Sequence, residues 1–277
     1  MSNTSENTVR TYRRVLSIAG SDSGGGAGVQ ADLKTFSALG CYGMTVLTAL
    51  TAQNTQGVRD IHPVPCSFVQ AQLGAVLDDI GVDAVKIGML FSADVIKDVA
   101  SVLTERNIKN IVLDPVMVAQ SGDKLLEERA IEAMGQSLMP AADLITPNLP
   151  EAEVLLQHSI DNVEAMHQSA RELAAFGSRA VLLKGGHREG KESTDILYIR
   201  DKDRTVKLRA EYVSTRNNHG TGCTLSSAIA AHLAHGLDME EAVRRGKEYI
   251  TQAILAGADY RLGRGHGPVH HFFKFWD

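Results

Sequence analysis

The sequence contains little cysteine, and its cysteines form no recognisable pair. The three residues, Cys41, Cys66 and Cys223, include no CxxC motif and cannot all pair with one another. Disulfide frameworks belong to oxidising compartments. This usage therefore predicts free thiols and a reducing, cytoplasmic setting.

Long apolar runs and an excess of either charge are also missing. No segment approaches the roughly 18 uninterrupted apolar residues of a membrane-spanning helix, so a membrane is not an expected partner. Lys plus Arg number 28 and Asp plus Glu 33, a net charge of −5 without a basic patch, so nucleic acid is not expected either. Residues 1–12 are polar, and we expect a flexible tail there rather than a signal peptide or anchor.

A zinc-type ligand set is absent as well. His270 and His271 are adjacent near the C-terminus, but no spaced Cys, Asp or His accompanies them. The pair therefore does not predict a metal site.

What remains is the composition of an ordinary globular protein. Of the 277 residues, 44% are hydrophobic and 22% are charged, which is ample for a sizeable core. Apolar strand segments alternate with helical patterns five or six times, without repeats or low-complexity linkers. This order predicts an α/β fold with a mainly parallel sheet between two helical layers, and we expect residues 13–277 to form a single domain.

The predicted elements follow from apolar periodicity and from turn residues. A hairpin is expected around residues 201–203. Strands are predicted at residues 13–20, 42–51, 84–90, 111–117, 143–151 (with polar residues at its end), 180–187 (ending in a lysine and two glycines), 195–200 and 205–212. Helices are predicted at 29–39, 64–80, 93–105 (capped by Ser92), 127–137, 161–176, 225–235 and 239–260.

A glycine-rich turn follows the first predicted strand, at residues 21–28. Its Gly26-x-Gly28-x-x-Ala31 spacing satisfies a loose dinucleotide fingerprint, but the next strand carries no acidic residue, so a Rossmann site is disfavoured. No Gly-Lys-Ser/Thr follows, so the turn is not a Walker A loop. We expect its glycines to allow close approach to a ligand, with Asp22 or Asp32 available for polar contact.

A second glycine-bracketed turn, residues 217–224, precedes a helix rich in small residues. Such a helix start presents unobstructed backbone N–H groups and can bind an anion. Cys223 lies at its edge, where the helix dipole would lower the thiol pKa and favour a base or nucleophile. The alternative is an ordinary turn, Gly220-Thr221-Gly222, with Cys223 as a small apolar core residue.

Polar residues stand just beyond several predicted strands, where open α/β sheets bind ligands. Gln53 could read a heterocycle with its amide or could cap a turn. Asp114 is a site candidate, and Lys184 can reach a phosphate. Asn148 and Glu151 could orient a hydrated Mg²⁺, although the same Asn-x-x-Glu spacing forms a helix capping box.

Taken in their order along the chain, the sequence motifs resemble those of hydroxymethylpyrimidine/phosphomethylpyrimidine kinases of thiamine biosynthesis, which are members of the ribokinase-like superfamily. The resemblance covers residues 15–273. It rests on residues 18–28, 30–32, 52–55, 86–90, 114–117, 146–151, 184–187, 219–224 and 267–272. Two departures concern phosphate contacts: Gln120 stands where lysine is usual, and Asn218 where threonine is common.

The resemblance implies phosphoryl transfer from MgATP to the hydroxymethyl group of 4-amino-5-hydroxymethyl-2-methylpyrimidine, and then to its monophosphate. It assigns the reading of the pyrimidine edge to Gln53. The residues that it implies for lining the same pocket are Gly20, Asp32, Met89 and Val116.

The family pattern also implies the groups that handle phosphate and metal. Lys184 and Thr221 would contact the ATP phosphates, and Cys223 would act as the base. Residues 220–223, which include Gly220, Thr221 and Gly222, would form the oxyanion hole. The residues implied for Mg²⁺ and its waters are Asp114, Glu151 and Asn148.

Two other functions stay open. A pyridoxal or pyridoxine kinase would use the same machinery on another hydroxymethyl heteroaromatic compound. A non-catalytic nucleotide or pyrimidine sensor is disfavoured, because Cys223, Lys184, Asp114 and Glu151 occur together. The family further suggests a homodimer, and the turn 120–123 and the loop after Gly186 are candidate lids.

Overall fold

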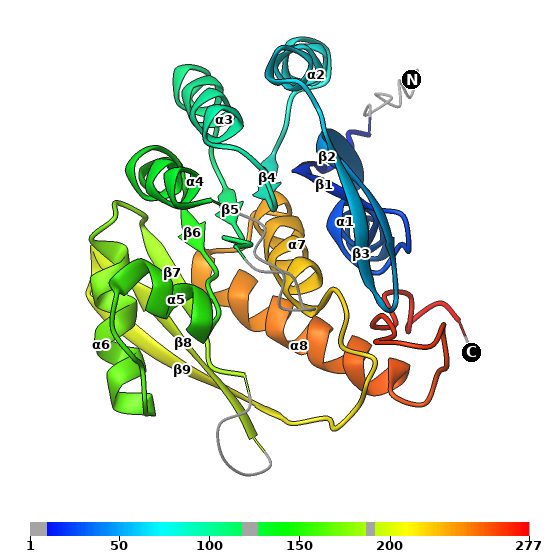
Figure 1. The fold of residues 1–277 in the computed structure, drawn as a ribbon. Coiled ribbons are helices and arrows are strands. Elements are labelled where there is room, and N and C mark those ends of the chain that lie inside the picture. The colour runs from blue at the N-terminus through cyan, green and yellow to red at the C-terminus, as the bar shows by residue number, and fades with distance from the viewer. Residues whose placement is uncertain (1–9, 118–126, 187–191, 277) are drawn as a thin grey trace, which may run out of the picture.

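The computed structural model describes residues 10–117, 127–186 and 192–276. Within these ranges, nine strands form one sheet in the order β3-β2-β1-β4-β5-β6-β7-β8-β9 (Figure 1). Strands β2, β1, β4, β5, β6 and β7 run parallel, and β3, β8 and β9 add antiparallel pairs at the two edges. Gln120 and both candidate lids lie outside the described residues.

The strands alternate with helices along the chain, as predicted. The strands are β1 (Arg14–Asp22), β2 (Tyr42–Asn54), β3 (Gly57–Pro63), β4 (Ala84–Ile87), β5 (Ile111–Leu113), β6 (Leu144–Ile145), β7 (Ala180–Lys184), β8 (Glu192–Ile199) and β9 (Arg204–Glu211). The helices are α1 (Gly28–Ala38), α2 (Cys66–Asp79), α3 (Ala93–Glu105), α4 (Glu128–Ala133), α5 (Leu149–Leu156), α6 (Val163–Ala174), α7 (Thr221–Ala234) and α8 (Met239–Gly257), with short π and 3-10 turns at Met134–Leu138, Met139–Ala141 and Arg200–Lys202.

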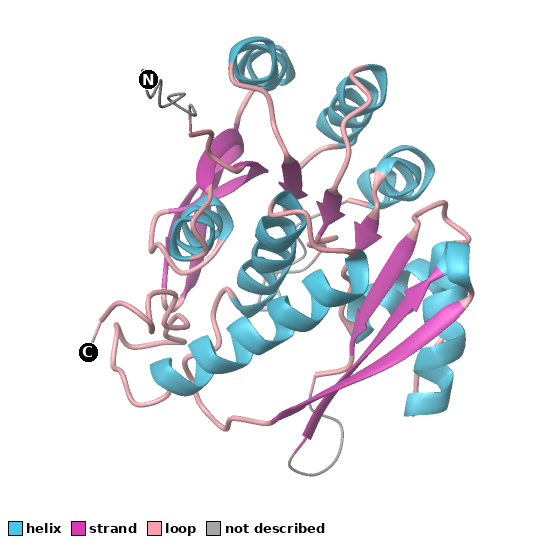
Figure 2. Cartoon of the chain, turned by 180° about the vertical axis from the view of Figure 1, so that it is seen from behind, coloured by secondary structure: helices cyan, strands magenta, loops and turns pink. Residues whose placement is uncertain are grey.

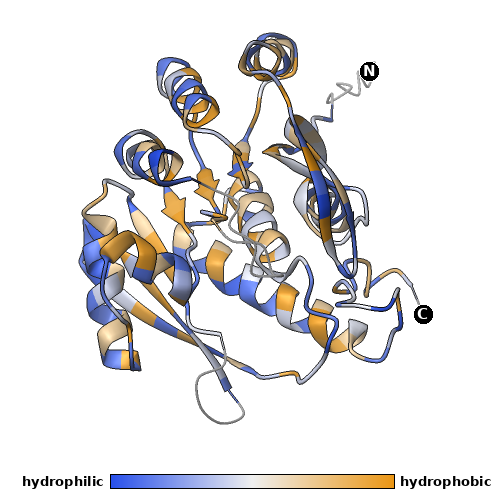
Figure 3. Ribbon diagram, viewed as in Figure 1, coloured by the Kyte–Doolittle hydropathy of each residue, from blue (hydrophilic) through white to orange (hydrophobic). Residues whose placement is uncertain are grey.

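Helices cover both faces of the sheet (Figure 2). One apolar cluster joins the strands to α2, α3, α4 and α6, and a second joins the other face to α1, α7 and α8. The two clusters form because successive side chains of a strand point to opposite faces of the sheet. In β1, for example, Leu16 belongs to the first cluster and Val15 to the second. The central strands β4, β5 and β6 are correspondingly apolar in Figure 3.

The predicted α/β class is confirmed, and so are the β8–β9 hairpin and the Ser92 cap of α3, whose hydroxyl accepts from the Val95 N–H. Strand β3 is missing from the predictions. It is an exposed edge strand that contains Arg59, Asp60 and His62, so it lacks the apolar alternation that marks a half-buried strand. No described helix is both long enough and apolar enough to span a bilayer.

Candidate active site

A cavity of about 400 Å³ lies at the carboxyl ends of the parallel strands, where the sequence predicts a site. Strand β1 contributes its last residues, and the loops after β4, β5 and β6 follow in order. The predicted site residues in its lining are Gly20, Gln53, Met89, Asp114, Val116, Asn148, Glu151, Lys184, Gly220, Thr221, Gly222 and Cys223.

The start of α7 forms one wall of this cavity. Gly220 precedes the helix with a φ of 78°, and a Cβ there would lie 1.8 Å from the Gly26 carbonyl oxygen. The N–H groups of Gly222 and Cys223 meet no acceptor within the described part of the chain. Orphan amides at a helix start that face a cavity can receive an anion, as predicted from the flanking glycines.

The glycine-rich turn after β1 is shaped by Asp22 rather than kept open for a ligand. The Asp22 carboxylate accepts hydrogen bonds from the N–H groups of Gly24, Gly26 and Ala27 at 2.8–3.0 Å. It also contacts His219 Nε2 at 2.9 Å. Its oxygens thus tie the turn to the segment that precedes α7. Asp22 also lines the cavity, so its contact with a ligand stays a prediction.

Asp114 and Lys184 form an ion pair in the cavity wall, near Gly222 of α7. Lys184 Nζ lies 2.8 Å from Asp114 Oδ1, and the Thr146 hydroxyl donates to the same oxygen at 3.1 Å. Although burial opposes both charges, Lys184 holds the pKa of Asp114 below its ordinary value, and Asp114 raises the pKa of Lys184. Both groups are therefore charged at neutral pH, with Lys184 placed to receive a phosphate.

Asn148 and Glu151 form the capping box that the sequence left as an alternative. The Asn148 side chain accepts from the Glu151 N–H at 2.9 Å, and Glu151 Oε2 accepts from the Asn148 N–H at 2.8 Å. Burial raises the pKa of Glu151 to about 7, against the opposing charge of Lys184. Lys184 offsets only part of the cost of burying the Glu151 carboxylate, which also lies beside Asp114. A further cation nearby would stabilise its charged form.

The described residues contain no cluster of three or more His, Cys, Asp or Glu side chains suited to a metal. Two buried carboxyls beside a lysine nevertheless suit Mg²⁺, which binds one or two carboxylates and keeps waters or substrate phosphates as its other ligands. Asp114 and Glu151 thus fit the predicted magnesium role. The role itself stays a prediction.

Cys223 lies in the cavity lining, but its thiol pKa departs from expectation. Burial raises the pKa above its ordinary value, and the charge of Lys86 and the Gly28 N–H oppose this effect. The carboxylates of Asp32 and Asp114 push the pKa further upward. The predicted lowering of the thiol pKa is therefore wrong for this site, because loss of water around the sulfur outweighs the groups that favour the thiolate.

Asp32 also departs from its predicted place in the substrate pocket. Its carboxylate has no solvent exposure and lies beneath the cavity, where Lys86 Nζ contacts both oxygens at 2.9 Å. Direct contact with a substrate is thus corrected to a supporting position. Lys86 itself lies in the cavity wall and was not singled out from the sequence, although a lysine within the apolar strand β4 already signals a buried partner.

A second cavity of about 320 Å³ adjoins the first across Lys184, Asn218 and Thr221. Its far end is partly apolar, with Leu225 and Ile250 in the lining. The start of α7 therefore lies between two compartments. Such an arrangement can hold two ligands whose reacting groups meet at the helix terminus.

These features agree with a solved structure of similar shape. The pyridoxal kinase from Staphylococcus aureus, in complex with AMP-PCP and pyridoxal, superposes with a TM-score of 0.85 and 36% sequence identity, covering 95% of this chain and 94% of that chain. The sheet, the cavity at its carboxyl edge and the open helix start thus define a ribokinase-like small-molecule kinase.

Sequence relatives narrow the class to one family. The family described as phosphomethylpyrimidine kinase matches residues 22–270, and this chain belongs to that family. The hydroxymethylpyrimidine/phosphomethylpyrimidine kinase of Rhizobium meliloti is 52% identical over 262 residues, covering 94% of this chain and 97% of that protein. The thiamine biosynthesis bifunctional protein ThiED of Geobacter sulfurreducens is 52% identical over 263 residues, or 95% of this chain; the chain spans about half (53%) of that relative's length.

Proposed function

We propose that this protein transfers the γ-phosphoryl group of ATP to the hydroxymethyl group of 4-amino-5-hydroxymethyl-2-methylpyrimidine, and then transfers a second one to the resulting monophosphate. The observation that carries the proposal is the position of the α7 start between two adjoining cavities. Thr221 and Lys184 line both cavities, and the next residues, Gly222 and Cys223, line the first cavity with N–H groups that meet no acceptor among the described residues.

The cavity at the carboxyl edge would receive the pyrimidine. Gln53 stands in its lining with an amide that offers a donor and an acceptor, and the exposed parts of Met89 and Val116 supply apolar surface for a ring. Gly20 leaves room beside Met89, since a Cβ there would lie 2.6 Å from the Met89 methyl carbon. A flat heteroaromatic ring suits this lining.

The second cavity would receive the nucleotide, with its phosphates directed to the start of α7. Lys184 and Thr221 lie where the cavities meet and would contact these phosphates, with Asn148 close by in the first cavity. Phosphoryl transfer needs alignment and charge stabilisation more than covalent chemistry, which bare amides and a lysine provide. Asp114 and Glu151 would hold Mg²⁺, which would neutralise phosphate charge when bound.

Cys223 would act as the base in the first transfer. A primary alcohol is a weak acid, so a group that takes its proton as the oxygen attacks phosphorus lowers the barrier. Cys223 lies in the cavity lining next to Gly222. The charge of Lys86 opposes the effect of burial on its pKa.

A pyridoxine kinase is the second candidate, because the chain is 36% identical to the Staphylococcus aureus pyridoxal kinase. Values of kcat/KM for the hydroxymethylpyrimidine and for pyridoxine, measured with ATP in the same assay, separate the two. We expect the pyrimidine to be favoured. A strong preference for pyridoxine would reverse the assignment, and nucleotide binding without turnover of either compound would indicate a sensor.

We also propose that residues 13–277 act as one domain, that the protein is cytoplasmic, and that it forms a homodimer. All nine described strands join one sheet, which supports a single domain. The exposed edge strand β3, with the exposed side chains of Leu50 and Phe68 nearby in the chain, offers a surface that a second copy could cover. Sedimentation velocity at micromolar concentration tests the dimer.

A further inference from the structure

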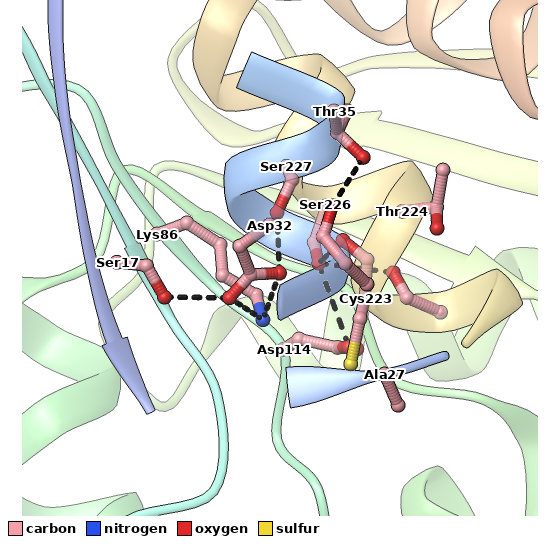
Figure 4. Close-up of polar contacts among 12 residues, drawn as sticks. Ser17, Ala27, Asp32, Thr35, Lys86, Asp114, Cys223, Thr224, Ser226 and Ser227 are labelled. Carbon is pink, nitrogen blue, oxygen red and sulfur yellow. Dashed lines mark hydrogen bonds and ion pairs between the residues drawn. The ribbon is translucent and has the colours of Figure 1, made fainter. Parts of the chain in front are cut away.

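A buried ion pair lies directly beneath the candidate active site. Lys86 Nζ contacts both carboxylate oxygens of Asp32 at 2.9 Å, and neither side chain is exposed. The hydroxyls of Ser17 and Ser227 donate to the same carboxylate at 2.5 and 2.7 Å. Figure 4 shows this group between the sheet and the start of α7, close to Cys223.

Strand alternation places these polar groups together. Ser17 of β1 is the register partner of Lys86 of β4, so both side chains leave the sheet on the face that α1 and α7 cover. The neighbours Val85 and Ile87 point to the opposite apolar cluster. A single lysine thus interrupts an otherwise apolar strand, at the position closest to the cavity on that face.

Stability alone does not explain the pair. Burying two charges costs a large desolvation free energy, and well-packed apolar residues of similar volume often serve as well or better. Asp32 is fully satisfied by its partners, whereas Lys86 also lies in the cavity wall with Cys223. The pair therefore lies directly against the cavity, on the side of Lys86.

The charges around the sulfur support this orientation. Lys86 of β4 lowers the pKa of Cys223, and its influence ranks above those of the carboxylates of Asp32 and Asp114, which raise it. Asp114 is itself neutralised by Lys184, from β7. The other carboxyls in the cavity lining are Glu151 of α5 and Asp22 of β1, and Asp22 contacts His219. Lys86 is thus the cation that most favours a thiolate at this place.

We propose that Lys86, held by Asp32, is a positioning residue that serves as the counter-ion of the Cys223 thiolate, and that it is required for phosphoryl transfer to the alcohol but not to the monophosphate. This inference rests on the proposed function and extends it by separating the needs of the two transfers at one site.

The proton balance of the two steps explains the separation. In the first, the hydroxymethyl oxygen bonds to the γ-phosphorus, its proton passes to the Cys223 sulfur, and the bond from phosphorus to the bridging oxygen breaks, so that ADP leaves with the electron pair. The thiol then returns the proton to water. In the second, the nucleophile is an oxygen of a phosphate monoester whose second pKa is about 6, so it carries no proton at pH 7.5 and needs no base.

The test compares both transfers in Lys86→Met. ADP formation is measured separately with the hydroxymethylpyrimidine and with its monophosphate, at saturating ATP and pH 7.5. We expect the rate with the alcohol to fall by about 10²-fold and the rate with the monophosphate to change by less than about threefold. Cys223→Ala should shift the ratio of the two rates in the same direction.

Two further variants separate this role from a structural one. Ser17→Ala removes one hydrogen bond to Asp32 but keeps the ion pair, and the ratio of the two rates should stay at the wild-type value. Lys86→Met combined with Asp32→Asn removes both charges, which avoids an unpaired buried carboxylate, and should reproduce the shifted ratio in a folded protein.

The outcomes distinguish a failure of the Lys86 inference from a failure of the proposed function. A wild-type protein active on both compounds, with an unchanged ratio in Lys86→Met and in the double variant, overturns the inference and leaves the proposed function intact. An equal fall in both rates in Lys86→Met also overturns the inference and leaves the proposed function intact, since it would mark a structural role for Lys86. A wild-type protein inactive on either compound overturns the corresponding transfer in the proposed function, and the inference with it.

Discussion

At the scale of single residues, the burial of a side chain determines the direction of its pKa shift more than its position in a helix does. Cys223 stands in the first turn of α7, yet burial raises its thiol pKa. Glu151 stands in the first turn of α5, and burial raises its pKa to about 7. Burial therefore favours the protonated form of both groups, and nearby cations oppose it: Lys86 at Cys223 and Lys184 at Glu151.

Replacing Cys223 tests the base directly. We expect Cys223→Ala and Cys223→Ser to lower kcat for the hydroxymethylpyrimidine by about 10²-fold or more, with KM little changed, because a base acts in the transition state rather than in binding. Steady-state ADP formation measures both constants. Near-normal turnover in these variants would remove Cys223 from the mechanism.

Replacing Glu151 tests the magnesium site. Glu151→Gln keeps an acceptor for the Asn148 N–H, so the capping box can persist while the charge is lost. We expect half-maximal activity to require about tenfold more Mg²⁺, since one of two carboxylates is removed. Glu164→Gln, at the exposed start of α6, is the control and should not alter the Mg²⁺ titration. An unchanged titration in Glu151→Gln would contradict this ligand assignment.

At the scale of elements, two glycine turns interlock to form the site. The turn after β1 packs against the start of α7, where Gly26 meets Gly220, and His219 bridges them through Asp22. The C-terminal segment lies behind this junction: His271 Nε2 lies 3.0 Å from the Thr224 hydroxyl. The two glycine turns and the C-terminal segment thus fix the position of the start of α7.

Gly220→Ala should disrupt this junction. Both Gly220 and Gly236 have a positive φ, 78° and 88°, but only at Gly220 would a Cβ collide, 1.8 Å from the Gly26 carbonyl oxygen. We expect Gly236→Ala to cost about 1–2 kcal/mol of unfolding free energy and to retain activity. Gly220→Ala should cost clearly more and lose most activity. Urea unfolding with ADP assays measures both, and equal effects of the two changes would refute the interlock.

His271 should make stability depend on pH. Burial lowers the pKa of His271 to about 3. As pH falls below about 6.5, the unfolded chain therefore binds a proton that the folded protein excludes, and the free energy of unfolding decreases. Between pH 7 and pH 5 this group alone should remove about 2 kcal/mol of unfolding free energy. His271→Gln should flatten that slope, whereas His270→Gln should leave it. Identical slopes in all three proteins would show that His271 is not buried in its neutral form.

At the scale of the whole molecule, strand and helix periodicity was enough to predict the layered α/β fold and the edge where the polar residues gather. Gln53, Asp114 and Lys184 stand at strand ends in sequence and meet in one cavity. What could not be predicted depends on contacts between distant segments. The burial of Asp32 beneath Lys86 and the sign of the Cys223 pKa shift are set by packing across β1, β4, α1 and α7, which periodicity does not report.

The stoichiometry of ADP released per pyrimidine tests the two proposed transfers together. Wild-type protein is incubated with limiting 4-amino-5-hydroxymethyl-2-methylpyrimidine, excess ATP and Mg²⁺ until release stops. We expect two ADP per pyrimidine, with the diphosphate as the final product by mass spectrometry. One ADP with accumulation of the monophosphate would contradict the second transfer, and no ADP at all would contradict the function assigned to this site.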